Sequence, residues 1–159
     1  MIRIGQGNDI HLFEEGKPLM LGGVHLEGHP GFKAHSDGDV LLHALIDALL
    51  GALALGDIGQ WFPDTDPQYA NADSRKLLQL VLQAPQFAKW RLVNLDATII
   101  TQTPKLAPSI PLIRESLAKL LDVAVDVISV KAKTNEHLDA IGRGEAAAAS
   151  VSLLLETIP

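Results

Sequence analysis

The chain has 159 residues, 47% of them hydrophobic and 20% charged, which predicts one folded domain spanning residues 1–159 rather than a disordered chain. Its net charge of −6 disfavours a surface for nucleic acid or for an anionic membrane. Because cysteine is absent, disulfides, cysteine-ligated zinc and thiol nucleophiles are excluded. The sequence shows no apolar export signal and no apolar run long enough to cross a bilayer, so we expect a cytoplasmic protein.

Hydrophobic periodicity predicts a pair of strands, two helices, and then strands on either side of a further helix. Gly22 and Gly23 are expected at a turn or bulge, and Ser36 or Asp37 is expected to cap the first helix. The order predicts an α+β fold, a single domain with a mixed β-sheet and helices packed on one face. The elements are strands over 1–13 and 17–28, a helix from about 36–39 to 55, a long polar loop over 56–74, a helix from about 74 that ends or kinks at Pro85, a strand over 91–102, a helix over 108–122, and strands over 127–135 and 146–156.

The first predicted helix carries one polar line along an otherwise apolar surface. Asp39, His43, Asp47 and Gly51 are spaced four residues apart, so they advance by about 40° per step around the helix. A helix that is apolar on most sides is buried, and buried polar groups need partners. Taken alone, this line is equally compatible with a core histidine that bonds only to Asp47.

The first strand supplies two more polar side chains. Asp9 and His11 are two residues apart and leave the same face of the strand, a pattern that by itself is ordinary alternation. With His43 they offer one carboxylate and two imidazoles, the number of protein ligands that a catalytic zinc uses while its fourth position stays open. The imidazoles favour zinc over magnesium, and Asp47 would then orient the ring of His43.

Further polar clusters lie elsewhere in the chain. His35 and Ser36 precede a helix, where free backbone N–H groups bind phosphate. Lys133 and Thr134 are of phosphate-binding types, and Glu136 is of a type that holds a hard cation. The alternative for these clusters is a capped helix and a solvated edge strand. Together with the metal ligands, they predict a metal-centred site beside a phosphate pocket, acting on a phosphoryl or diphosphate group.

Seven segments also match one known family in their order and spacing. Over essentially its whole length the chain resembles the 2-C-methyl-D-erythritol 2,4-cyclodiphosphate synthases of the non-mevalonate isoprenoid pathway, through IGQGNDIH, AHSDGDVLLHALIDALLGALALGDIG, FPDTDP, ADSRKLL, TIITQTPKLAP, VKAKTNE and GRGEA. The resemblance implies a phosphorus–oxygen lyase that converts 4-diphosphocytidyl-2-C-methyl-D-erythritol 2-phosphate to 2-C-methyl-D-erythritol 2,4-cyclodiphosphate plus CMP. The reaction would be a metal-assisted intramolecular phosphoryl transfer, in a homotrimer whose subunits share each site.

The resemblance also implies roles for individual residues. Asp9, His11 and His43 would bind one Zn²⁺ per subunit, and Glu136 would hold Mg²⁺ or Mn²⁺ on the substrate diphosphate. The expected catalytic groups, which stabilise the transition state, are His35 and Thr134.

The substrate-binding positions come from several segments of the chain. Residues 57–59 and 62–66 match the loop around the methylerythritol part of the substrate, and residues 101–107 match the cytosine pocket. The full set is Asp9, Ile10, His11, His35, Ser36, Asp57, Ile58, Gly59, Phe62, Pro63, Asp64, Thr65, Asp66, Thr101, Gln102, Thr103, Pro104, Lys105, Leu106, Ala107, Lys133, Thr134, Asn135, Glu136, Ala140 and Arg143.

Some positions depart from the commonest family pattern. Lys133 and Asn135 stand where many relatives have Thr, and Ala140 replaces an aromatic residue found in some of them. Two other functions stay open on the residues alone. One is a zinc-dependent phosphodiesterase or phosphatase, in which the metal would activate water. The other is a non-catalytic trimer that stores zinc or binds isoprenoid diphosphates.

Overall fold

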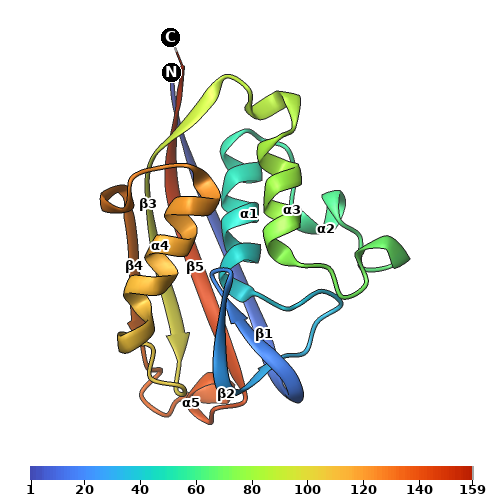
Figure 1. Ribbon diagram of the computed structural model, residues 1–159, viewed down its shortest axis with the longest axis vertical. Helices are drawn as coiled ribbons and strands as arrows, with labels where there is room; N and C mark the ends of the chain where they lie inside the picture. The colour runs from blue at the N-terminus through green and yellow to red at the C-terminus, as the bar shows by residue number, and fades with distance from the viewer. Residues whose placement is uncertain (159) are drawn as a thin grey trace.

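The structure, a computed structural model, describes residues 1–158, and its strands and helices follow the predicted order (Figure 1). The strands are β1 (Ile2–Leu21), β2 (Val24–Phe32), β3 (Trp90–Thr101), β4 (Ile128–Lys133) and β5 (Ala146–Thr157). The helices are α1 (Val40–Ala52), α2 (Ile58–Trp61), α3 (Ser74–Leu82), α4 (Ile110–Leu121) and α5 (Asp139–Gly142). The four-residue helices α2 and α5 were not expected, and α2 lies inside the segment predicted as one long loop.

The strands form one mixed sheet in the order β2-β1-β5-β3-β4. All neighbours pair antiparallel except β3 and β4, which are parallel, so the predicted mixed sheet is confirmed. The hairpin between β1 and β2 turns at Gly22 and Gly23, as expected, and both residues have positive φ angles that favour glycine. This hairpin places the second half of β1 beside β2, while the first half pairs with β5.

The helices α1, α3 and α4 lie on one face of the sheet (Figure 1). From Ile4 to Leu12 of β1, exposed residues alternate with buried or half-buried ones: Gly5 and Gly7 are buried, whereas Ile4 and Gln6 are exposed. The same alternation continues in β3 and β5, as expected for a sheet that is covered by its own chain on one side. The predicted packing of helices on one face is therefore confirmed.

Helix α1 is packed directly onto β1 at two glycines. A Cβ atom on Gly5 would lie 1.9 Å from the carbonyl oxygen of Ala48, and one on Gly7 would lie 2.1 Å from that of Ala44. Nearly every residue of α1 is buried, as its apolar sequence predicted. Because the backbones are so close, the side chain of His43 on α1 reaches the side chains that leave the same face of β1.

Asp39 fixes the start of α1, which corrects the predicted cap. Its side chain accepts a hydrogen bond from the backbone N–H of Leu42 and also from those of Gly22 and Gly23 in the hairpin turn. Burial raises the pKa of Asp39, and the three hydrogen bonds act in the opposite direction. The prediction of Ser36 or Asp37 as the cap was wrong because the carboxylate that accepts from the first-turn N–H of Leu42 is that of Asp39.

The other face of the sheet carries several exposed apolar side chains and is not covered by the described part of the chain. On β1, Ile2, Ile4, Ile10 and Leu12 are between 51% and 73% exposed, and they all point away from α1. Exposed apolar side chains on an uncovered sheet face are typical of an interface with another molecule, and here the exposed Gln6 and Asn8 lie between them. Within residues 1–158, no helix is long and apolar enough to span a membrane.

Candidate metal centre and substrate cavities

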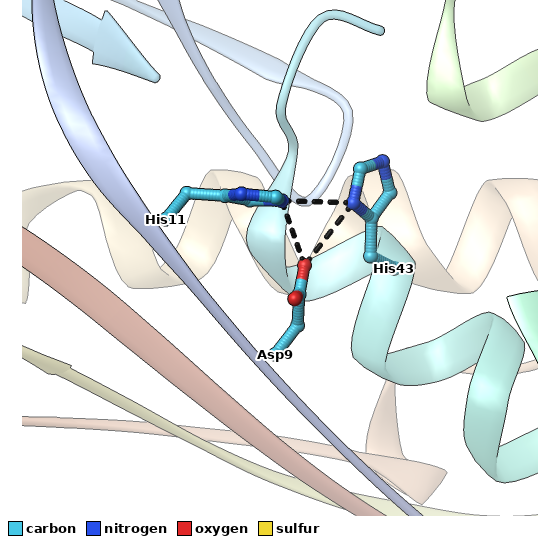
Figure 2. Close-up of side chains that lie close together, drawn as sticks. All are labelled: Asp9, His11 and His43. Carbon is cyan, nitrogen blue, oxygen red and sulfur yellow. Dashed lines mark hydrogen bonds and ion pairs between the residues drawn. The ribbon is translucent and has the colours of Figure 1, made fainter. Parts of the chain in front are cut away.

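Asp9, His11 and His43 meet at one point between β1 and α1, as predicted (Figure 2). The Oδ2 atom of Asp9 lies 2.9 Å from Nε2 of His11 and 3.1 Å from Nδ1 of His43. The two imidazole nitrogens are 3.1 Å apart. The strand period of two brings Asp9 and His11 to the same face, and the close packing of α1 on Gly5 and Gly7 brings the third ligand to them.

The charges of these three side chains fit a bound cation. Burial raises the pKa of Asp9, but hydrogen bonds and charge interactions with His11 and His43 outweigh it and lower that pKa to about 2. Burial also acts to lower the pKa of His43, whereas the hydrogen bond and charge of Asp9 raise it, with a net increase. A negative carboxylate and two ring nitrogens that converge on one point form a site that either hydrogen-bonded protons or a metal ion can occupy.

The donor set also fits zinc in its geometry. Donor atoms that lie about 2.0–2.2 Å from a tetrahedral zinc are roughly 3.3–3.5 Å from one another. The three observed separations, 2.9 to 3.1 Å, are slightly shorter than this, so a small outward movement of the side chains would complete the site. Two imidazoles and one carboxylate are also the ligand types that favour zinc over magnesium or calcium.

Asp47 does not orient His43, which corrects the prediction made from their spacing. Its Oδ1 atom accepts a hydrogen bond of 2.7 Å from the backbone N–H of Ile58, so it joins α1 to α2 instead. The Nδ1 atom of His43 faces Asp9, and its Nε2 atom lies 2.9 Å from the hydroxyl of Ser74 and 3.1 Å from that of Ser36. Both ring nitrogens thus have partners other than Asp47, although Asp47 is one helical turn away.

A cavity of about 470 Å³ opens from the metal ligands. The predicted residues that line it are Asp9, His11, His35, Ser36, His43, Ile58, Gly59, Phe62, Pro63 and Asp64. Ala34, Tyr69 and Leu77 line it too and were not expected. The signal that could have identified Tyr69 as a lining residue is its aromatic side chain within the predicted polar loop. Its ring packs edge-on against Phe62, with ring centroids 5.2 Å apart.

Two predicted residues of the loop, Asp57 and Asp66, stabilise its conformation and do not line the cavity. Asp57 caps α2 through the N–H of Gln60, and Asp66 accepts a bond from the N–H of Gln68. Thr65 lies between the lining residues and Asp66 but is not part of the lining.

A second cavity, of about 190 Å³, gathers the predicted cytosine segment at the ends of β3 and β4. Its lining contains Thr101, Gln102, Pro104, Lys105, Leu106, Ala107, Ala132, Lys133 and Thr134. Thr103 is not part of this lining, but its carbonyl oxygen accepts a 2.6 Å hydrogen bond from the hydroxyl of Thr101. Among residues 1–158 the two cavities share no lining residue, and the two expected catalytic groups, His35 and Thr134, lie in different cavities of one chain.

The remaining predicted residues line neither of these two cavities. Glu136 is exposed with a φ of 50°, and the hydroxyl of Thr134 donates to its Oε1 over 3.4 Å. Asn135 donates to the carbonyl oxygen of Leu138 and to Asp139, which shapes the same turn. Arg143 is paired with Glu145, Ala140 is half-buried beside this turn, and Ile10 lines a shallow hollow on the uncovered face of the sheet.

The fold and the site define a metal-binding α+β protein in which three ligands open onto a cavity of small-molecule size. The chain belongs to the YgbB family, whose model matches residues 2–156. The family resemblance seen in the sequence segments is therefore confirmed.

Curated relatives match nearly the full chain. A protein of Alcanivorax borkumensis is 56% identical over 156 residues, which cover 98% of this chain and 98% of the relative. A protein of Haemophilus ducreyi is 54% identical over 155 residues, which cover 98% of this chain and 97% of the relative. Both are named 2-C-methyl-D-erythritol 2,4-cyclodiphosphate synthase.

Solved structures share the fold. The bifunctional IspDF from Campylobacter jejuni superposes with a TM-score of 0.94 at 42% identity; the match covers 99% of this chain and 43% of that longer chain. The CDP complex of IspF from Plasmodium falciparum superposes with a TM-score of 0.85 at 34% identity and covers 99% of this chain and 97% of that one.

Proposed function

We propose that this protein converts 4-diphosphocytidyl-2-C-methyl-D-erythritol 2-phosphate to 2-C-methyl-D-erythritol 2,4-cyclodiphosphate and CMP, in the non-mevalonate route to isoprenoids. The observation that carries this proposal is the meeting of Asp9, His11 and His43 at the mouth of a cavity that also contains His35 and Ser36. The names of the close relatives support the same reaction. In class it is a phosphorus–oxygen lyase, and its setting is the cytoplasm.

The reaction is an intramolecular displacement at phosphorus. An oxygen of the 2-phosphate attacks the β-phosphorus of the same molecule and forms the new P–O bond that closes the ring. The bond from the β-phosphorus to the bridging oxygen breaks, and CMP leaves with that oxygen and its electron pair. Because the attacking and leaving groups belong to one folded substrate, the protein must hold them in line and reduce the repulsion among their negative charges.

The residues of the first cavity suit this task. A Zn²⁺ held by Asp9, His11 and His43 supplies positive charge to the phosphates when it is bound. His35 and Ser36 bind and orient a phosphate group beside that site. Phe62 and the neighbouring loop residues exclude water, which would otherwise hydrolyse the diphosphate. The absence of cysteine is consistent with a reaction that needs no nucleophile from the protein.

Glu136 and the second cavity would serve the other end of the substrate. The exposed carboxylate of Glu136 holds Mg²⁺ or Mn²⁺ on the diphosphate, and Thr134 stabilises the transition state beside it. The cavity lined by residues 101–107 takes the cytosine; one relative was solved as a CDP complex, which supports a cytidine nucleotide as the ligand. Lys133 lines the same cavity and adds a positive charge.

The separation of the two cavities supports a homotrimer with shared sites. Within one chain, the metal ligands and the cytosine segment line different cavities, so one chain alone does not surround the whole substrate. The uncovered apolar face on β1 provides a surface for association between copies of the chain. In the assembly, the cytosine cavity of one subunit would lie beside the metal centre of the next.

The product of the reaction tests the proposed function. With substrate, Zn²⁺ and Mg²⁺, the purified protein is expected to release CMP and a cyclic diphosphate, both resolved by phosphorus NMR. His43→Ala is expected to lose zinc and nearly all turnover while it remains folded, whereas His25→Ala, an exposed histidine of β2, is expected to keep both. A linear phosphate product would show a phosphodiesterase or phosphatase, and normal turnover of His43→Ala would refute the zinc assignment.

A further inference from the structure

His43 is backed by two side chains on the side away from the metal site. Its Nε2 atom lies 2.9 Å from the hydroxyl oxygen of Ser74, and that oxygen lies 2.5 Å from Oδ1 of Asp37. The backbone N–H of Ser74 donates to Oδ2 of the same carboxylate over 3.0 Å. Ser74 is fully buried, so its contact with His43 is closed to solvent, whereas its two hydrogen bonds with Asp37 are partly buried.

The chemistry of these groups fixes the direction of each hydrogen bond. An ionised carboxylate can only accept, so the single proton of the Ser74 hydroxyl goes to Asp37. The Ser74 oxygen then has only lone pairs to offer to His43. At 2.9 Å two lone pairs would repel, so Nε2 of His43 must carry a proton and donate it.

We propose that Ser74, held in place by Asp37, is a positioning residue that fixes the tautomer of His43. A neutral imidazole with its proton on Nε2 has its free electron pair on Nδ1, and Nδ1 is the atom that faces Asp9 and His11. The inference rests on the proposed metal site, because it explains how one nitrogen of His43 is kept available as a ligand. This is the task that the sequence had assigned to Asp47.

The same arrangement frees the hydroxyl proton of Ser36. Its oxygen lies 3.1 Å from Nε2 of His43 and accepts a bond from the backbone N–H of Gly38. Once Nε2 donates to Ser74, neither of these contacts uses the proton of Ser36. Ser36 lines the cavity, so this proton is available to an anionic group bound there.

Ser74 and Asp37 also connect the metal ligand to the end of the polar loop. Ser74 is the first residue of α3, and the backbone N–H of Asp37 donates to the carbonyl oxygen of Ala72 over 3.0 Å. Asp73 caps α3 at the same place. The loop that lines the cavity and the ring that binds the metal are therefore held by one set of hydrogen bonds.

Zinc affinity of the protein tests the proposal without any assay of activity. Metal-free protein is titrated with Zn²⁺ against a chelator of known affinity. Ser74→Ala is expected to bind Zn²⁺ about 10–100-fold more weakly, the usual effect of losing the partner of a metal-bound histidine. Asp37→Asn, which keeps the serine but removes the charge, is expected to give a smaller loss. The control is Ser116→Ala on α4, which removes a hydroxyl that donates a hydrogen bond to the carbonyl oxygen of Gly22. This variant is expected to bind zinc like the unchanged protein.

A spectroscopic signature separates positioning from a general structural effect. In the zinc-loaded protein, the Nε2 proton of His43 is expected as a downfield, slowly exchanging resonance in nitrogen-edited NMR spectra. Ser74→Ala is expected to move this resonance upfield and to speed its exchange with water, while the other histidines keep their positions.

The possible results separate this inference from the proposed function. An unchanged protein that binds no zinc would overturn the metal site itself. Zinc binding that is equal in Ser74→Ala and the unchanged protein, with the Nε2 resonance in place, would overturn only the role of Ser74. If Asp37→Asn and the unchanged protein bind zinc with equal affinity, the role of Asp37 is overturned.

Discussion

Asp9 is an ionised carboxylate held between two imidazoles, and this single residue sets the charge of the metal centre. Its pKa is lowered to about 2, although burial alone would raise it. The same interaction raises the pKa of His43 above its ordinary value of 6.5, although burial alone would lower it. Protons and a metal ion therefore compete for the same place, the space between Asp9 and the ring of His43.

Zinc affinity is expected to depend on pH because of this competition. The raised pKa of His43 means that near pH 6.5 its ring keeps the proton on Nδ1 more often than a free imidazole does, and zinc must displace that proton. Apparent affinity should therefore fall as pH decreases through the raised pKa, by about tenfold per pH unit for each proton displaced. Asp9, with a pKa of about 2, contributes no titration in this range. Chelator competition from about pH 8 to pH 5 measures the effect, and a flat profile would contradict it.

Glu136→Gln is expected to weaken activation by Mg²⁺ or Mn²⁺ and to leave zinc content unchanged. The substitution removes the charge of an exposed carboxylate that lies outside the group of zinc ligands. The measurement is turnover as a function of Mg²⁺ concentration, with metal content determined in parallel. Glu115→Gln, on the exposed side of α4, is the matched control. Wild-type dependence on Mg²⁺ in Glu136→Gln would remove this residue from the proposed role.

At the scale of elements, the contact between α1 and β1 decides whether the metal ligands meet. Gly5 and Gly7 allow the helix backbone to lie against the strand, and Ala44 and Ala48 are the helical residues at the contact. The position of His43 therefore depends on residues that touch no ligand. A loss of this packing would separate the two halves of the site while leaving each of its side chains intact.

Gly7→Ala is expected to destabilise the protein by about 1–3 kcal/mol, because the added Cβ would overlap the carbonyl oxygen of Ala44 and force α1 outward. Zinc binding should weaken with it. The control is Gly51→Ala, at a glycine of α1, the helix that packs on Gly7. Its Cβ would meet only one atom, at 3.8 Å, and alanine favours helix by about 0.5–1 kcal/mol. Urea unfolding measures both, and equal stability of the two variants would contradict this account of the packing.

The sequence predicted most elements because their hydrophobic periods are clear. Alternation along β1 and the nearly uniform apolar character of α1 predicted these two elements. The ligand types that they carry then predicted that Asp9, His11 and His43 meet. The role of Asp47 was mispredicted because spacing on a helix places two residues side by side but does not say where a ring points. Ser74 is 31 residues from His43, and no local pattern joins residues at such a separation.

At the scale of the whole molecule, the described residues of one chain form two separate cavities and leave one face of the sheet uncovered. The metal ligands lie between β1 and α1 (Figure 2), and residues 101–107, which are predicted to bind cytosine, lie at the ends of β3 and β4. The family resemblance implied sites shared between subunits, but the motifs alone do not say that one chain holds its metal ligands and residues 101–107 in separate cavities. The proposed trimer accounts for both features.

A trimeric mass is expected in analytical ultracentrifugation. Ile4→Asp places a charge on a side chain that is 73% exposed in the single chain and would be buried in the proposed interface, so it is expected to give monomers. These monomers should still bind zinc, since all three ligands belong to one chain, but should lose cyclisation. Leu80→Asp changes an exposed leucine of α3 and should remain trimeric. A monomeric mass for the unchanged protein would refute the trimer.

Because the two cavities share no lining residue among residues 1–158, a substitution in one cavity and a substitution in the other can be placed on separate chains. A chain without His43 and a chain without Thr134 would each be inactive as a pure assembly. Refolded together in equal amounts, they would place an intact half from one parent against an intact half from the other at about a quarter of the subunit boundaries. Two inactive variants would thus recover activity when they assemble together. Genetic complementation between the corresponding alleles would be expected for the same reason.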